Sequence, residues 1–169
     1  EVVRRFNHLY GPVFPEPQGR LAETPLVLGT DNRKMSKSYG NTIDLSDDAE
    51  AVRQKVRQMY TDPKRVRADI PGTVEGNPVF IYHDAFNPDR EEVDDLKARY
   101  QTGKVGDVEV KTKLSNALNA MLDPLRERRA AVAAKPEQVR EILIEGSRKA
   151  RAVAEETMGR VRDAVKLRY

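Results

Sequence analysis

Residues 33–41 read RKMSKSYGN, and the pattern of the chain changes on either side of them. Before them, residues 26–28 (LVL) form a short apolar run ended by Gly29, which is typical of the tip of a buried strand. After them, from Ser46 onward, apolar residues recur at helical spacing. The stretch itself is too polar to be buried. It is therefore predicted to be a loop between the edge of an α/β domain and an all-α domain.

The segments around this loop support a mainly α fold. Residues 1–10 have the apolar spacing of a helix that ends at Gly11-Pro12. A connector with four prolines follows over residues 11–25 and is predicted to be extended. Ser46, followed by acidic residues, is predicted to be the N-cap of the first helix after the loop.

Four further helices are predicted downstream. The dipeptides Asn77-Pro78 and Asn87-Pro88 each indicate a helix start, because proline is favoured in the first helical turn. Two long helices are predicted over residues 107–133 and after Pro136. Pro124 is expected to kink or interrupt the first of them, because it has no N–H to donate. The second half of the chain is therefore predicted to be a helical bundle.

The composition excludes several classes of protein. The 169 residues include no cysteine, so disulfides and thiolate metal sites are excluded and a cytoplasmic location is predicted. No apolar run approaches the roughly 18 residues that a membrane span needs. No signal-peptide pattern opens the chain. A protein with no membrane partner is expected.

Charge is distributed unevenly along the chain. Residues 1–102 carry 15 basic and 17 acidic side chains, whereas residues 103–169 carry 15 basic and 10 acidic ones. A basic surplus on a helical half is compatible with a polyanionic partner. A solvated surface with lysine and arginine in slight excess is the alternative interpretation.

The polar loop has the residue types that handle phosphate. The ammonium groups of Lys34 and Lys37 can neutralise a polyphosphate, and the hydroxyls of Ser36 and Ser38 add uncharged donors. A loop in this position can close on a nucleotide and stabilise charge that develops in the transition state. No glycine-rich phosphate cradle with an adjacent lysine is present, so a P-loop is excluded. A solvated basic turn remains the alternative.

The pentapeptide KMSKS resembles the second signature of the class I aminoacyl-tRNA synthetases. Longer segments that surround it, and others further along the chain, extend the likeness to the tryptophanyl-tRNA synthetases. These segments are GTDNRKMSKSYGNTIDL, VFPEPQ, GNPVFIYHDAF and VGDVEVKTKLSNALNAMLDPLRERRA. The resemblance covers nearly the whole chain.

One departure from the family is large. The Rossmann half of these enzymes carries a HIGH-type motif, and neither of the two histidines, His8 and His83, stands in one. Because the chain also begins with Glu1, we expect it to be the C-terminal half of a synthetase. The resemblance then implies that residues 1–45 are the C-terminal remnant of the Rossmann-type catalytic domain. Residues 46–169 would be a helical anticodon-binding domain.

The resemblance implies a chemical role for the loop. Such enzymes activate an amino acid with ATP, release pyrophosphate and transfer the acyl group to tRNA. Lys37 and Lys34 are the predicted catalytic residues, and Lys37 is expected to stabilise the transition state. The implied ATP-binding residues are Lys34, Met35, Ser36, Lys37, Ser38 and Val27. Mg²⁺ is implied as an ion bound through the ATP phosphates rather than through a protein metal site.

The helical half is expected to bind tRNA. Basic residues of the 107–133 segment provide the candidate contacts, which are Lys111, Lys113, Arg126 and Arg129. For each of them a solvated helix charge is the competing interpretation. For Arg126 and Arg129 an ion pair with neighbouring acids is a further one.

The implied partners are ATP, tryptophan and tRNA, with a homodimer for the intact enzyme. Two alternatives stay open. The chain could act as a helical RNA-binding fragment without catalysis of its own, or the parent could be the related tyrosyl enzyme.

A few other residues are given structural roles. His83 lies on the apolar face of its helix and is predicted to be packed rather than catalytic. Tyr82, Phe86 and Tyr100 are predicted to belong to the core. Asn41 is expected, with the glycine before it, to shape the exit of the loop.

Overall fold

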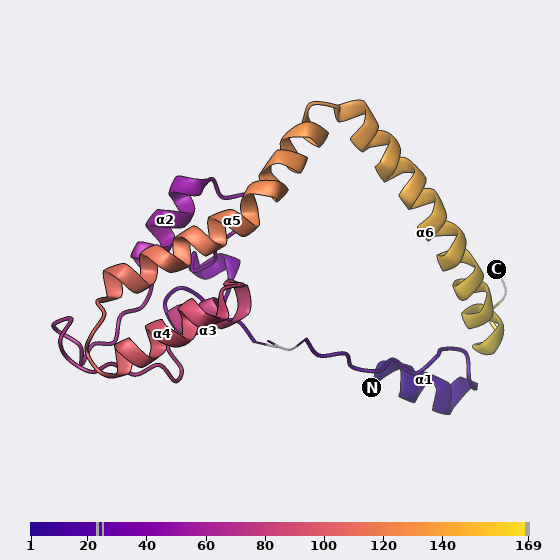
Figure 1. Cartoon of the computed structure of the whole chain (residues 1–169). Coiled ribbons are helices and arrows are strands. Elements are labelled where there is room, and N and C mark those ends of the chain that lie inside the picture. Colours follow the sequence, from indigo (N-terminus) through magenta and orange to yellow (C-terminus); the bar gives the residue numbers. More distant parts are fainter. Residues whose placement is uncertain (23, 25, 168–169) are drawn as a thin grey trace. The chain divides into compact units, whose positions relative to one another are not determined.

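The computed structural model describes residues 1–22, 24 and 26–167, and within them the chain is helical (Figure 1). Its elements are α1 (Val2–Tyr10), the 3₁₀ turn η1 (Lys37–Tyr39), α2 (Ala49–Arg57), α3 (Pro78–Phe86), α4 (Arg90–Gln101), α5 (Asp107–Ala133) and α6 (Pro136–Ala164). The opening helix and both long helices match the prediction.

The chain forms two compact units. One consists of Glu1–Leu21 with Ala131–Tyr169, and the other of Ala22–Ala130. The second unit contains the RKMSKSYGN loop together with α2, α3, α4 and nearly all of α5. This division does not coincide with the predicted boundary at residue 45, because the loop packs with the helices that follow it.

The expected strand at residues 26–28 is reduced to a single bridge. Leu28 pairs with Lys34 in antiparallel fashion, and the described residues contain no longer strand. The Leu28 carbonyl also accepts a hydrogen bond from a helix, since the hydroxyl of Tyr82 donates to it over 2.9 Å. A strand needs an adjacent strand to pair its backbone, and the described segments supply one only at this point.

Helix starts follow side-chain capping. Asn77 caps α3 by accepting from the Val79 N–H at 3.0 Å, as predicted for Asn77-Pro78. The predicted cap at Ser46 is wrong, because α2 begins at Ala49 after Asp48.

The start of α4 also differs slightly from the prediction. Asp89 is its cap, two residues beyond Asn87, and accepts from the Glu92 N–H at 2.9 Å. In both α2 and α4 the N-cap is an aspartate that follows the predicted capping residue, because its carboxylate reaches an N–H of the first turn.

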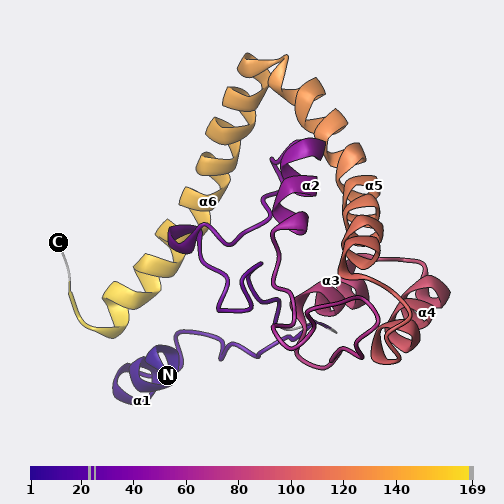
Figure 2. The same ribbon diagram turned by 90° about the vertical axis from the view of Figure 1, so that its left-hand side faces the viewer.

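The core of the second unit lies among α2, α3, α4 and α5, and Figures 1 and 2 both show α2 alongside α5. Its buried hydrophobic residues are Val52, Val56, Met59, Val79, Phe80, Tyr82, Leu96, Tyr100, Val105, Val110, Leu114, Leu118 and Leu122. The predicted core positions of Tyr82 and Tyr100 are confirmed, while Phe86 is partly buried against the same cluster.

Arg65 holds the long connection between α2 and α3 in place. Its guanidinium is fully buried and lies 4.0 Å from the centroid of the Tyr100 ring. It donates to the carbonyls of Ile70, over 2.8 Å, and Val105, and it pairs with Asp107 at 3.2 Å. The charge is therefore neutralised and hydrogen-bonded, as burial of an arginine requires.

Helix α5 continues through Pro124, so the predicted interruption does not occur. In the other unit, the Phe6 ring of α1 packs against Tyr10 and Phe14 with centroids 4.9 and 5.0 Å apart.

Across the described residues, no helix is both long and apolar enough to cross a membrane. The same residues include no cluster of three or more metal-binding side chains.

Candidate functional site

The RKMSKSYGN loop begins as a tight turn after Leu28. The Gly29 N–H donates to the Arg33 carbonyl at 2.7 Å, and the Asn32 N–H donates back to Gly29 at 3.0 Å. Asn32 has a φ of 64°, in the left-handed region that asparagine tolerates better than most residues. The turn reverses the chain and delivers Lys34 to its bridge with Leu28.

Asn41, at the far end of the loop, ties the segment together. It is only 3% exposed. Its side-chain oxygen accepts from the Ser36 N–H at 2.8 Å, and its amide nitrogen donates to the Asp31 carboxylate at 2.8 Å and to the Lys34 carbonyl at 3.1 Å. One carboxamide therefore fixes the backbone on both sides of Met35.

Glycine at position 29 makes room for that carboxamide. A Cβ placed on Gly29 would lie 2.2 Å from the Asn41 amide nitrogen, far inside van der Waals contact. The backbone of the loop exit is also joined to the turn, because the Thr30 N–H donates to the Asn41 carbonyl at 2.9 Å. The entry and the exit of the loop are thus held against each other.

The second lysine lies on a single 3₁₀ turn. Gly40 ends this turn with a φ of 65° and donates its N–H to the Lys37 carbonyl. Lys34, Lys37 and Ser38 are exposed, whereas Ser36 is half-buried. The loop therefore presents two ammonium groups and a hydroxyl to solvent on a backbone that its own side chains constrain.

One carboxylate, that of Asp31, is paired with Arg33 at the start of the loop. Asp31 accepts from Asn41 and from both the backbone N–H and the guanidinium of Arg33. These contacts, with the Asn41 hydrogen bond the largest, lower the pKa of Asp31 to about 2. The Arg33 guanidinium also lies 5.4 Å from the centroid of the Tyr39 ring. The Arg33 guanidinium is thus engaged within the loop although its side chain is 68% exposed, and Lys34 and Lys37 are exposed as well.

The loop is docked onto the helices of its unit. Val27, Met35 and Ile43 are partly buried against the hydrophobic core. The Tyr60 N–H donates to the Thr30 carbonyl at 2.7 Å, and burial raises the pKa of Tyr82 to about 12, which keeps its hydroxyl a donor to Leu28. Two predicted ATP-binding residues, Val27 and Met35, thus serve to anchor the loop.

The basic residues predicted to bind tRNA lie in three different environments. Lys111 is only 8% exposed. Its ammonium donates to the carbonyls of Met59 at 2.6 Å and Arg57 at 3.3 Å and to the Thr61 hydroxyl at 2.8 Å. Burial lowers the pKa of Lys111. The interpretation of Lys111 as a surface cation is therefore replaced by a structural role, in which it caps the C-terminal end of α2.

Arg126 is also used within the fold. Its guanidinium donates to the Asp47 carbonyl at 2.8 Å and to the Asn119 side-chain oxygen at 2.9 Å, and it pairs with Asp123 at 2.6 Å. The ion-pair interpretation thus describes its geometry, although about a fifth of the side chain stays exposed. Arg129 lies fully on the surface of α5.

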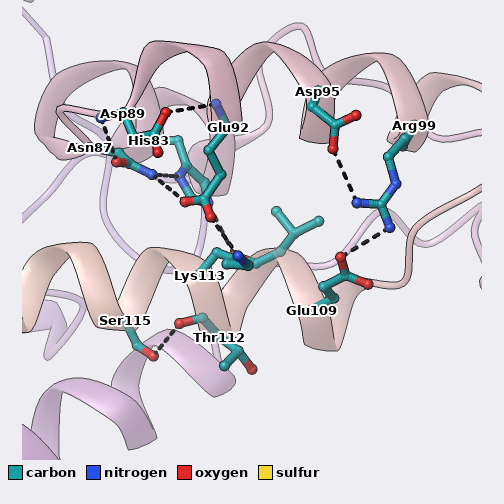
Figure 3. A network of polar contacts seen from close by, with 11 residues as sticks. His83, Asn87, Asp89, Glu92, Asp95, Arg99, Glu109, Thr112, Lys113 and Ser115 are labelled. Carbon is teal, nitrogen blue, oxygen red and sulfur yellow. Dashed lines mark hydrogen bonds and ion pairs between the residues drawn. The ribbon is translucent and has the colours of Figure 1, made fainter.

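Lys113 belongs to a polar network between α3, α4 and α5 (Figure 3). Its ammonium pairs with Glu92 at 2.6 Å, which raises the pKa of Lys113 and lowers that of Glu92. Glu92 also accepts from Asn87 at 3.2 Å, and Asn87 contacts the buried His83 ring at 3.2 Å. The predicted packed position of His83 is confirmed.

Comparison with known proteins identifies the family. Residues 1–123, more than half of the chain, match the model of the family described as tRNA synthetases class I (W and Y). The chain belongs to this family. The resemblance inferred from the KMSKS segment is thereby confirmed.

The relatives of this class I synthetase chain point to the tryptophan branch. It is 56% identical over 168 residues to the tryptophan–tRNA ligase of Treponema pallidum, covering 99% of this chain and 50% of the relative. It is 51% identical over 170 residues to the enzyme of Borreliella burgdorferi, covering 99% and 48%. The chain thus spans about half the length of the curated relatives it matches.

A solved structure agrees with the fold. Tryptophanyl-tRNA synthetase from Campylobacter jejuni, in complex with ADP and tryptophan, matches with a TM-score of 0.73 and 30% identity. The match covers 98% of this synthetase chain and 51% of that one. The comparisons by sequence and by structure thus each match this chain to about half the length of a relative.

Sequence reasoning missed two features of the loop of this synthetase chain. Asp31 was not assigned a role, and Asn41 was predicted only to shape the exit. Their positions could have indicated these roles. Asp31 stands before a turn and Asn41 follows Gly40, and the side chains of aspartate and asparagine often hydrogen-bond to nearby backbone. Their mutual contact spans ten residues and could not be read from local spacing.

Proposed function

We propose that this chain is the part of a tryptophan–tRNA ligase that supplies the ATP and pyrophosphate loop and a tRNA-binding helical surface. The observation that carries the proposal is the constrained RKMSKSYGN loop, with Lys34 and Lys37 exposed, in a chain of this family. The complete reaction joins tryptophan to its tRNA through an aminoacyl-adenylate. Because the chain spans about half of its relatives, the remaining groups would come from the other half.

In the proposed mechanism the loop acts on the phosphates of ATP. Lys34 and Lys37 neutralise the pyrophosphate that leaves when the tryptophan carboxylate attacks the α-phosphorus. Lys37 contributes most in the transition state, where negative charge on the leaving group grows. Ser36 and Ser38 offer hydroxyl and backbone donors to the same oxygens. Val27 and Met35 position the loop beside the nucleotide through their packing.

Mg²⁺ fits this arrangement as an ion that is bound to the substrate ATP. The described residues show no cluster of carboxylates or histidines that would hold a divalent ion by themselves. The ion is therefore proposed to arrive with ATP and to be bound through its phosphates.

The helical part is proposed to bind tRNA through the exposed cations of α5. Lys113 and Arg129 are the main candidates, and Arg126 contributes its exposed fraction. Lys111 is left out of this surface because it is buried. A homodimeric parent enzyme in the cytoplasm belongs to the same proposal.

A chimeric enzyme tests the proposal. These 169 residues would replace the matching half of the Treponema pallidum relative, to which they are 56% identical. Tryptophan-dependent ATP–pyrophosphate exchange by the chimera, and none by the remaining half alone, is the expected result. A folded chimera that binds ATP and tryptophan but exchanges no pyrophosphate would contradict the catalytic role of this chain and leave the RNA-binding alternative.

Binding of tRNA by the 169-residue chain tests the second role. Lys113→Ala should weaken binding and flatten its dependence on salt, because one phosphate contact and its counterion release are lost. Lys64→Ala, another exposed lysine, is the matched control. An unchanged salt dependence would assign Lys113 to the solvated surface.

A further inference from the structure

Asn41 lies outside the KMSKS pentapeptide, yet its side chain holds the backbone of two residues within it. The carboxamide oxygen accepts from the Ser36 N–H at 2.8 Å, and the carboxamide nitrogen donates to the Lys34 carbonyl at 3.1 Å. Because Asn41 is only 3% exposed, water does not compete for these hydrogen bonds. The course of the backbone through Lys34 and Ser36 therefore depends on one buried side chain.

The 3₁₀ turn that carries Lys37 begins at a residue that Asn41 holds. Ser36 is the N-cap of η1, and its carbonyl accepts from the Tyr39 N–H at 3.0 Å. The turn ends at Gly40, whose N–H donates to the Lys37 carbonyl at 3.2 Å, and Asn41 follows directly. The carboxamide thus joins the two ends of the turn. A side chain that must meet a ligand is presented more exactly when its backbone is held in this way.

Asp31 fixes the orientation of the carboxamide itself. An asparagine side chain can present either its oxygen or its nitrogen in a given direction, and its partners determine which. The Asp31 carboxylate accepts from the Asn41 nitrogen at 2.8 Å, so the oxygen faces the Ser36 N–H. The pKa of about 2 keeps Asp31 ionised, and hence an acceptor, at neutral pH. Gly29 leaves the space that this arrangement needs, since a Cβ there would lie 2.2 Å from the Asn41 nitrogen.

We infer that Asn41, oriented by Asp31, is a positioning residue that sets Lys37 against the leaving pyrophosphate during adenylate formation. The inference rests on the proposed function of the loop and adds a residue that acts through Lys37 rather than on ATP. In this step a carboxylate oxygen of tryptophan bonds to the α-phosphorus. The bond from that phosphorus to the pyrophosphate oxygen breaks, and its electron pair stays with the pyrophosphate. The Lys37 ammonium meets this growing charge only where its backbone places it, and a misplacement of about 1 Å can cost on the order of 100-fold in rate.

Single-turnover adenylate formation by the chimeric enzyme, without tRNA, tests the inference. Asn41→Ala should lower the rate about 30- to 100-fold but change the apparent Kd for ATP less than about threefold, because both lysines are still present. Asn87→Ala is the matched control. Asn87 is also 3% exposed and makes side-chain hydrogen bonds to His83, Glu92 and Asp89, outside the loop, so this variant should retain the parent rate. A near-parent rate for Asn41→Ala would overturn the inference.

Two further measurements separate positioning from a general loss of structure. Transfer of tryptophan from supplied tryptophanyl-adenylate to tRNA involves no ATP phosphate, so Asn41→Ala should keep that rate within about twofold of the parent. In a Lys37→Ala background, Asn41→Ala should cost less than about threefold, because two changes that remove the same contact are not additive. Equal losses in both steps, or the full loss in the Lys37→Ala background, would overturn the inference.

A second pair of variants carries the test if Asn41→Ala does not fold. Asn41→Asp places two carboxylates at the 2.8 Å contact with Asp31 and should slow adenylate formation, since like charges repel there. Adding Asp31→Asn restores an amide–carboxylate hydrogen bond with donor and acceptor exchanged, and should recover at least about tenfold in rate. No recovery would overturn the inference.

Failure of the inference is distinguishable from failure of the proposed function. A slow Lys37→Ala beside a normal Asn41→Ala would overturn the positioning role alone. A Lys37→Ala variant that keeps the parent rate would overturn the proposed function of the loop, and the inference would fail with it.

Discussion

At the scale of single residues, Asn41 and Asp31 explain how a polar loop of nine residues keeps a defined shape. The carboxamide of Asn41 satisfies Ser36 and Lys34 on the backbone and Asp31 on the turn. None of these contacts uses the side chain of Lys34 or Lys37, and both side chains remain exposed. Sequence reasoning identified the cations from residue type alone. It could not identify this clamp, which joins residues on either side of the motif.

Replacing Asn41 with alanine should raise the pKa of Asp31 from about 2 toward its usual value of 3.8, since the Asn41 hydrogen bond is the main cause of the shift. Carboxyl chemical shifts followed by NMR during acid titration measure the change. Asn116→Ala, an exposed asparagine outside the loop, is the control. A pKa of Asp31 that stays near 2 in Asn41→Ala would show that the clamp does not act on this carboxylate.

Replacing Lys111 with methionine should lower the free energy of unfolding by about 1.5–3 kcal/mol, because the carbonyl of Met59 loses a charged donor in a buried position. Urea denaturation followed by tyrosine fluorescence measures it, and Lys64→Met is the exposed control. Equal stability of the two variants would contradict the stabilising role given to the hydrogen bonds of Lys111.

At the scale of elements, the predictable features were those with a local physical cause. Asn77-Pro78 marks the start of α3, since one residue caps the helix and the next has the right φ. Where several neighbouring residues could cap a helix, the predicted N-cap was wrong by two residues, as at Ser46, where Asp48 is the cap. The strand at residues 26–28 was predicted from apolarity, but strand formation depends on a neighbour that local sequence does not specify.

The buried His83 predicts a pH dependence of stability. Burial lowers its pKa below 6.5 in the folded chain. As the pH falls through 6.5, the unfolded state therefore binds a proton that the folded state does not, and the folded state loses stability until its own pKa is reached. The loss should approach about 1.4 kcal/mol for each pH unit in that window.

Urea unfolding at pH 7.5 and pH 5.5 measures this contribution. His83→Gln should reduce the difference between the two pH values. His8→Gln, which changes the exposed histidine of α1, should preserve it. The same pH dependence in His83→Gln as in the parent chain would assign it to other groups.

At the scale of the whole molecule, the KMSKS loop shares a compact unit with α2, α3, α4 and most of α5. Its anchors on Tyr82 and Tyr60 join the proposed phosphate loop to the helices that carry the proposed RNA contacts. The family could be predicted because its motifs are contiguous in sequence. The unit boundaries could not, because they depend on how the loop packs.

The most direct test of the central claim is the single-turnover rate of adenylate formation in the chimeric enzyme with Lys37→Ala. The account predicts a rate about 100- to 1000-fold lower than that of the parent chimera, because a cation that acts in the transition state is removed. The KM for ATP should change far less, and Lys64→Ala should retain the parent rate. A near-normal rate for Lys37→Ala would contradict the assignment of this loop to the chemistry of ATP.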